Sequence, residues 1–186
     1  MLMPEWSRIA RRTRVPLGFA FAVFYFWLAR PTWRSMALGA IVIVLGLLVR
    51  AFASGHVRKN EVLATSGPYA YTRNPLYLGS LLISVGFAMV ARSWWVGIVL
   101  AVMFFGIYFP VILDEETFLR QKFPDFDEYA RRVPRMFPRL TPHRGAEDSA
   151  SPGFILDLYL KHREYNALLG TLAMMAVLVA KLILFP

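Results

Sequence analysis

The sequence predicts an all-α, polytopic membrane protein with about five transmembrane helices and a polar pocket formed by loops and short helices. Three observations support this prediction: the chain contains five long apolar runs, its mean hydropathy is +0.47, and its arginines gather beside those runs. A helix of about 20 apolar residues is long enough to cross a bilayer. The apolar runs are residues 15–29, 35–53, 76–91, 94–113 and 167–185.

The composition limits what kind of protein this is. The 186 residues include 21 Lys and Arg against 12 Asp and Glu, which gives a net charge of +9. Because the basic residues flank apolar runs, they indicate contact with anionic lipid headgroups rather than with nucleic acid. The absence of cysteine excludes disulfides and thiolate chemistry. The three histidines, His56, His143 and His162, lack metal-ligand spacing, so no metal site is expected.

The first two apolar runs have features of membrane helices. Four arginines precede the first run, and bulky residues 24–27 lie near its end, where a signal peptide would need a small-residue cleavage site. A membrane helix is therefore the better interpretation. In the second run Gly39 and Gly46 are seven residues apart, so they share one helix face and permit close packing.

The third and fourth runs are separated by only Arg92 and Ser93, which predicts a tight helical hairpin. Trp94 and Trp95 mark a membrane interface. The region after the fourth run is charged and rich in proline, and we expect it to contain a separate short helix over residues 115–122.

The predicted domain organisation follows from these elements. Residues 1–144 form a membrane core with four spans and two polar blocks, 59–79 and 115–138. Residues 145–153 have the composition of a flexible linker. Residues 154–186 contain an interfacial segment and the fifth span.

Charge asymmetry predicts the orientation. The N-terminal segment contributes four basic residues, the region from Arg50 to residue 75 another four, and residues 114–164 nine, so one side holds 17 of the 21. Basic loops face the cytoplasm. The prediction is an integral protein of a bacterial inner (plasma) membrane, with the N-terminus and both polar blocks cytoplasmic and the C-terminus outside.

The polar block at residues 59–79 combines glycines, prolines and tyrosines between two apolar runs. Asn74 precedes a proline and is therefore disfavoured as a helical residue, while Pro75 suits the first turn of a helix. Free backbone N–H groups at that helix start, with Arg73 beside them, favour an anionic group. Three tyrosines and an arginine in nine residues would suit a nucleoside with a carboxylate tail. The alternative is an interfacial belt, because Tyr and Arg also gather at membrane boundaries.

Two blocks of residues carry a family resemblance. The first is Leu63-x-Thr65-x-Gly67-Pro68-Tyr69-x-x-x-Arg73-Asn74-Pro75-x-Tyr77-x-Gly79. The second is Glu115-Glu116, Leu119, Phe123, Tyr129 and Val133-Pro134-Arg135-x-x-Pro138. Together they resemble the signature of the isoprenylcysteine carboxyl methyltransferase and phospholipid methyltransferase family, integral membrane enzymes that use S-adenosylmethionine. The resemblance covers roughly residues 35–140.

The resemblance implies roles for individual residues. It implies cofactor-binding residues at Glu61, Leu63, Gly67, Tyr69, Asn74, Pro75, Tyr77, Glu115 and Arg135. It also suggests Glu115 and Arg73 as the catalytic residues. From the residues alone, a solvated helix end is the favoured interpretation of the Glu115-Glu116 pair, since carboxylates facing lipid are expensive and the alternative needs a polar pocket.

One departure from the family pattern bears on the substrate. The isoprenylcysteine branch has an arginine one turn before the cofactor glutamate, and Val111 stands in that place here. A valine cannot pair with a carboxylate, so the acceptor is open between a lipid amine or phospholipid-like head and an isoprenylcysteine-like carboxylate. The same branch usually has histidine where Glu61 stands.

The sequence therefore predicts a membrane methyltransferase that uses S-adenosylmethionine on a lipophilic acceptor and binds membrane lipids but no nucleic acid. One alternative is an NADPH-dependent enzyme of the sterol reductase type, whose similar motif continues with an acidic residue where Ser80 follows Gly79 here. Another is a non-enzymatic scaffold whose polar loop binds lipid headgroups. No internal repeat and no Gly-x-Gly-x-x-Gly sequence is present, which argues against a transporter built on repeats and a soluble cofactor fold.

Overall fold

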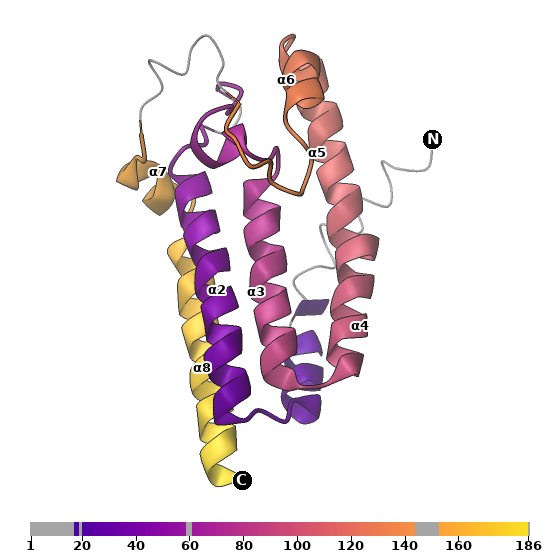
Figure 1. Cartoon of the computed structure of the whole chain (residues 1–186), viewed down its shortest axis with the longest axis vertical. Coiled ribbons are helices and arrows are strands. Elements are labelled where there is room, and N and C mark those ends of the chain that lie inside the picture. The colour runs from indigo at the N-terminus through magenta and orange to yellow at the C-terminus, as the bar shows by residue number, and fades with distance from the viewer. Residues whose placement is uncertain (1–16, 19, 59–60, 144–152, 186) are drawn as a thin grey trace.

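Long helices form the body of the molecule, and short helices and loops gather at one end of it, which we call the loop end (Figure 1). The computed structural model describes residues 17–18, 20–58, 61–143 and 153–185. Residues 17–18 and 20–28 are helical. The remaining helical elements are α2 (Trp33–Ser54), the 3₁₀ turn η1 (Gly67–Ala70), α3 (Pro75–Ala91), α4 (Trp94–Met103), the π-helical turn η2 (Phe104–Tyr108), α5 (Phe109–Lys122), α6 (Phe126–Arg132), α7 (Leu156–Lys161) and α8 (Tyr165–Leu184).

The all-α membrane architecture predicted from the sequence is confirmed. The described residues contain no strand. Three helices are long and apolar enough to cross a membrane, namely Trp33–Ser54, Trp94–Lys122 and Tyr165–Leu184. A fourth apolar helix, Pro75–Ala91, is somewhat shorter at 17 residues. The helical segment ending at residue 28 falls on the first predicted span.

α2 and α3 run side by side in close contact, as the spacing of the glycines predicts. A Cβ atom on Gly46 would lie only 2.6 Å from the carbonyl oxygen of Gly79. A Cβ atom on Gly39 would come equally close to the carbonyl oxygen of Gly86. Side chains larger than hydrogen would force the two helices apart, so both glycine pairs set the distance between them.

The expectation that the fourth span ends at residue 113 and that a separate helix follows is wrong. The chain is one continuous helix from Trp94 to Lys122, built from α4, η2 and α5. Pro110 lacks the N–H needed for a regular helical bond, and the π-helical turn lies directly before it. Beyond Pro110 the residues up to 122 include no Gly or Pro, so nothing stops the helix where the apolar run ends.

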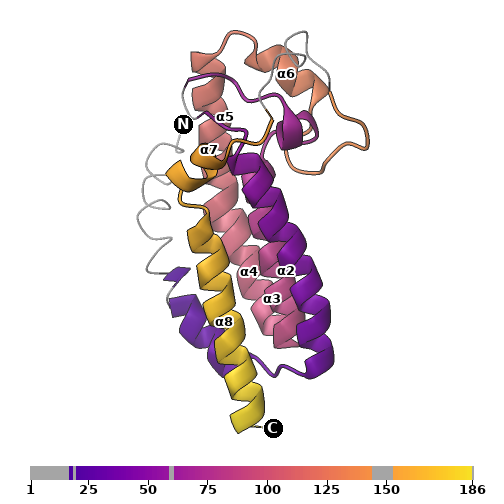
Figure 2. The same cartoon turned by 90° about the vertical axis from the view of Figure 1, so that its left-hand side faces the viewer.

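The two ends of the helical array are distinct. Opposite the loop end, the backbone N–H of Arg30 donates to the carbonyl of Ala91 at 2.9 Å, which joins the connection before α2 to the α3–α4 hairpin. There Lys181 of α8 also donates to the carbonyl of Ala29 at 2.8 Å. α8 runs from the loop end to this opposite end (Figure 2). The basic N-terminal segment and residues 145–152 of the predicted linker lie outside the described residues.

Candidate functional site

A pocket of about 200 Å³ lies at the loop end, between the first polar block and α5. Its walls come from three regions of the sequence: the loop after α2, the start of α3, and the region from α5 to α6. The lining residues are Val57, Arg58, Val62, Leu63, Ala64, Tyr69, Arg73, Asn74, Pro75, Leu76, Tyr77, Glu115, Glu116, Leu119, Phe126 and Tyr129.

The local sequence explains how the chain enters α3 beside this pocket. Asn74 has φ −126° and ψ 56°, outside the helical region, and Pro75 is the first residue of α3, as predicted. Gly67 has a positive φ of 57°, and a Cβ there would lie 2.5 Å from the imidazole of His56. Glycine is thus required at this turn by both its backbone conformation and the available space.

The two motif blocks are joined by hydrogen bonds of the main chain. The N–H of Arg73 donates to the carbonyl of Pro134 at 2.9 Å, and the N–H of Arg139 donates to the carbonyl of Tyr71 at 3.0 Å. The hydroxyl of Thr72 lies 3.1 Å from the carbonyl oxygen of Arg135. Segments about 60 residues apart in the sequence therefore form a single structured unit.

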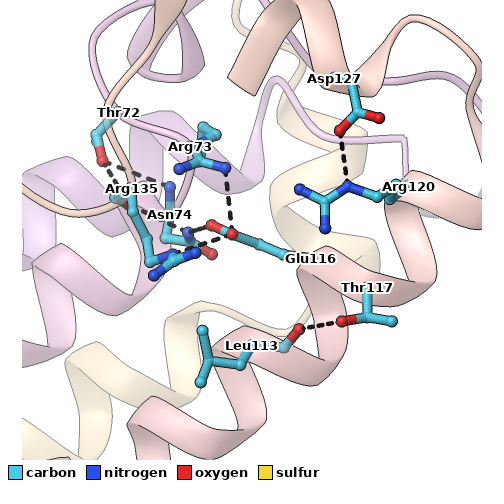
Figure 3. Close-up of polar contacts among 9 residues, drawn as sticks. All are labelled: Thr72, Arg73, Asn74, Leu113, Glu116, Thr117, Arg120, Asp127 and Arg135. Atoms are coloured by element: carbon cyan, nitrogen blue, oxygen red, sulfur yellow. Dashed lines mark hydrogen bonds and ion pairs between the residues drawn. The ribbon is translucent and has the colours of Figure 1, made fainter. Parts of the chain in front are cut away.

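Glu116 is the centre of this unit (Figure 3). One oxygen of its carboxylate accepts hydrogen bonds from Arg73 Nη1 at 3.1 Å and from Arg135 Nε at 3.0 Å. The other accepts from Asn74 Nδ2 at 3.0 Å. Its side chain is only 5% exposed, so one buried carboxylate fixes residues of both motif blocks.

Arg73 is held tightly in this arrangement. Its side chain is 12% exposed, and its Nε atom has no hydrogen-bond partner in the described part of the chain. Burial lowers the pKa of Arg73, and the nearby Glu116 carboxylate acts in the opposite direction. The guanidinium therefore depends on Glu116 to compensate for its lost hydration.

Glu115 has a different environment from its neighbour. It is exposed and lines the pocket, where its Oε2 accepts a hydrogen bond from the hydroxyl of Tyr77 at 3.1 Å. The Tyr77 ring meets the ring of Tyr108 edge-on, with centroids 6.5 Å apart. Tyr108 belongs to the π-helical turn η2, so this turn supplies an aromatic neighbour to the pocket wall.

A small apolar cluster supports the opposite wall. Phe126, Tyr129 and Val133 are buried together against Leu63 and Leu119. The hydroxyl of Tyr129 donates to the carbonyl of Tyr69 at 2.8 Å. Burial is the main cause that raises the pKa values of both tyrosines, so Tyr129 keeps the proton that it donates.

Most of the residues predicted to bind the cofactor meet at this pocket. Those that line it are Leu63, Tyr69, Asn74, Pro75, Tyr77 and Glu115, and Arg73 joins them. Three others lie outside the lining. Glu61 is exposed, 3.9 Å from the ammonium of Lys161; Gly67 shapes the turn; and Arg135 contacts Glu116. The functional roles themselves stay predictions.

Sequence reasoning missed three charged residues around the site. The motif resemblance assigns a function to Glu115 but none to Glu116, because nothing in the sequence shows which of two adjacent glutamates points inward. Arg58 lines the pocket with an exposed side chain. Arg50 contacts α3 and Glu164, and its only sequence signal is a charge near the end of an apolar run. For metal, no group of three His, Cys, Asp or Glu in the described ranges lies close enough to hold an ion.

Comparison with known families decides where the chain belongs. A model of the phospholipid methyltransferase family matches residues 17–125, more than half of the sequence. This protein belongs to the phospholipid methyltransferase family. The matched part contains the first motif block, the α3–α4 hairpin and both glutamates at 115 and 116, so family membership covers most of the pocket wall.

Two relatives of this protein are named as metal-resistance proteins. The cobalt-zinc-cadmium resistance protein CzcN of Cupriavidus metallidurans is 40% identical over 139 residues, 71% of this chain and 64% of that protein. The nickel-cobalt-cadmium resistance protein NccN of Alcaligenes xylosoxydans xylosoxydans is 36% identical over 118 residues, 61% of this chain and 55% of that protein. The matches thus span less than two thirds of either relative.

A more distant relative has a chemical name. The protein-S-isoprenylcysteine O-methyltransferase of Schizosaccharomyces pombe is 28% identical over 81 residues, which are 43% of this chain and 34% of that protein. No solved structure matches. Family and relatives together support the coarse assignment of a membrane methyltransferase.

Proposed function

We propose that this protein is an integral membrane methyltransferase that transfers the methyl group of S-adenosylmethionine to a lipophilic acceptor. The observation that supports this most is the pocket, where six of the nine residues predicted to bind the cofactor meet from both motif blocks. The family match supports the same chemistry. The sterol reductase and scaffold alternatives are left without a supporting observation of this kind.

The charges of the pocket suit this cofactor. Arg73 and Glu116 pair with each other, which leaves Arg58 and Glu115 as the lining charges without an ion pair among the described residues. S-adenosylmethionine has a carboxylate and an ammonium group, so Arg58 and Glu115 offer one opposite charge to each. The pocket is smaller than the usual 300–1,000 Å³ of ligand sites. Binding of S-adenosylmethionine therefore requires the pocket to widen.

When bound, the cofactor would supply an activated methyl group: an acceptor nucleophile would form a bond to that carbon in line as the carbon–sulfur bond breaks, and a neutral thioether would leave. The chain's task is to hold the two reactants in line and to exclude water. Leu63, Leu119 and Phe126 give the pocket an apolar wall that serves the second purpose. Tyr77 orients Glu115 through its hydroxyl.

The surroundings of Val111 favour an amine-headed acceptor. Val111 is 7% exposed and lies outside the pocket lining, and Arg73 and Arg135 are both engaged by Glu116. Of the cations that line the pocket, Arg73 is paired with Glu116 and Arg58 is assigned to the cofactor, so none is left to hold an acceptor carboxylate. An amine acceptor needs no cation to hold it, although it must lose a proton before it attacks.

Titration of the purified protein with radiolabelled S-adenosylmethionine and, in parallel, with NADPH tests the proposal. Saturable binding of the methyl donor and transfer of label to a lipid amine would support it. Saturable binding of NADPH alone would favour the reductase, and binding of neither would favour the scaffold. Strong labelling of a prenylcysteine analogue would overturn the preference for an amine.

The orientation is part of the proposal, with the loop end and its pocket in the cytoplasm of a bacterial inner membrane. The basic segments within residues 54–75 and 114–143 lie at the loop end, and α8 ends opposite to them. By the positive-inside rule we expect the C-terminus outside. A reporter that is active only outside the cytoplasm should be active when fused after Pro186, and its inactivity there would contradict this orientation.

We expect Arg58→Gln to weaken binding of S-adenosylmethionine about tenfold, because a charge-assisted hydrogen bond to the carboxylate would be lost. Binding isotherms of the variant and the unaltered protein measure this. Arg131→Gln is the control, since Arg131 is an exposed cation of α6 that does not line the pocket. Equal affinities for the two variants would remove Arg58 from the site.

A further inference from the structure

A second ion pair, partly buried, lies next to the pocket and involves the C-terminal part of the chain. Arg50, near the C-terminal end of α2, donates from Nη2 to Glu164 Oε2 at 2.7 Å and from Nε to the same oxygen at 3.0 Å. The two side chains are 22% and 12% exposed. Glu164 directly precedes α8 and is 114 residues away in the sequence.

Arg50 uses its remaining donor on the first turns of α3. Its Nη1 donates to the carbonyl of Leu76 at 3.3 Å and to the hydroxyl of Ser80. The Ser80 hydroxyl itself donates to the carbonyl of Leu76 at 3.0 Å. Leu76 and its neighbour Tyr77 line the pocket, whereas Arg50 does not. Arg50 therefore supports this part of the pocket wall from outside the pocket.

The segment that carries Glu164 is fixed to the end of α2. The N–H of Ile155 donates to the carbonyl of Gly55 at 3.0 Å, and the ring of Phe154 meets that of Phe52 edge-on at 5.9 Å. Nδ1 of His162 lies 3.2 Å from the carbonyl oxygen of Ser54. Arg163 adopts a left-handed conformation with φ 54°, which is uncommon for a residue other than glycine.

This position of Arg50 depends on its partner. An arginine near the end of an apolar helix can extend to the water at the membrane surface, where its charge is hydrated. Without Glu164 the guanidinium would have one carbonyl and one hydroxyl to offset lost hydration, which are weaker partners than a carboxylate. Glu164 therefore decides whether Arg50 stays against α3.

We propose that the C-terminal segment is part of the methyltransferase site, with Glu164 as a positioning residue that acts through Arg50 on the first turn of α3. The binding part of this proposal rests on the proposed function. Residues 153–164 lie beyond the part of the chain that matches the family model. They are thus an addition that supports a pocket built by the matched part.

Glu164→Gln in the full-length protein, reconstituted in lipid nanodiscs, tests the proposal with two readouts. Hydrogen–deuterium exchange should become faster at the amides of residues 77–81 while exchange in α6 stays unchanged. The dissociation constant for S-adenosylmethionine should rise about tenfold, with a smaller change in turnover. Glu164→Asp keeps the charge and should restore both values in part.

Two controls separate positioning from general stability. Glu128→Gln removes a surface pair with Arg132, in which both side chains are more than half exposed, and should change neither readout. Arg163→Gly suits the left-handed backbone and keeps Glu164, so it should also change neither. Unchanged exchange at residues 77–81 in Glu164→Gln would overturn the proposal, as would faster exchange throughout the molecule. Failure of the unaltered protein to bind the methyl donor would refute the proposed function, while the exchange readout would still decide the coupling.

Discussion

Replacing Glu116 with glutamine should destabilise the loop end of the protein and abolish binding of S-adenosylmethionine. The change leaves Arg73, buried at 12% exposure, and Arg135 facing each other without the carboxylate between them. Removing one partner of a buried ion pair costs roughly 3–5 kcal/mol. Arg135 is 39% exposed and can turn toward water, so we expect a loss of about 3 kcal/mol, near the lower end of that range. Denaturant titration of the variant and the unaltered protein in detergent measures this change in the free energy of unfolding.

Asp127→Asn is the matched control for this experiment. Asp127 pairs with Arg120 at 2.7 Å, but both side chains are more than half exposed. Surface pairs contribute little to stability, so the control should change it by less than about 1 kcal/mol. Similar losses for the two variants would show that Glu116 does not organise the site.

Glu115→Gln should have the opposite profile, with stability retained and the affinity for S-adenosylmethionine reduced about 10- to 100-fold. Glu115 is exposed at the pocket, and its carbonyl oxygen as glutamine can still accept the hydrogen bond of Tyr77. The loss is that of a hydrogen bond to a charged ligand group, roughly 1.5–3 kcal/mol. Binding isotherms and unfolding curves of the same preparation separate the two effects.

Normal binding of the methyl donor by Glu115→Gln together with lost transfer would contradict its assignment to the cofactor. It would assign the carboxylate to the acceptor instead. A comparison with Glu116→Gln is informative because the two substitutions are chemically identical and one residue apart. Their different outcomes would come from the different burial and partners of the two carboxylates.

The sequence predicted those features that depend on local chemistry. Pro75 begins α3 as expected, because a proline tolerates only the first turn. Gly46 permits close helix packing as expected, because the spacing of small residues marks one face. Tyr69, Asn74, Tyr77 and Glu115 all line one pocket, because a two-helix hairpin returns the chain to its starting side.

Other features could not be predicted because they depend on how long a helix continues and on distant partners. The apolar run ends at residue 113, but α5 continues to Lys122, since helix propensity does not require apolar residues. Because both glutamates lie within this continuous helix, adjacent side chains point in different directions, and Glu116 is buried while Glu115 is exposed. Arg50 and Glu164 are 114 positions apart in the sequence. No motif around either residue points to the other as its partner.

The hydrogen bonds between the two motif blocks set an order of events during biosynthesis. Arg73 and Tyr71 leave the ribosome before α3 to α5, yet their main-chain partners Pro134 and Arg139 follow the whole hairpin. Two membrane crossings must therefore be made before the first block can acquire its final shape. A nascent chain that has just completed α5 holds a membrane hairpin but lacks the hydrogen bonds between the first block and Tyr129, Pro134 and Arg139. The insertion of the protein into the bilayer thus precedes its competence to bind a ligand.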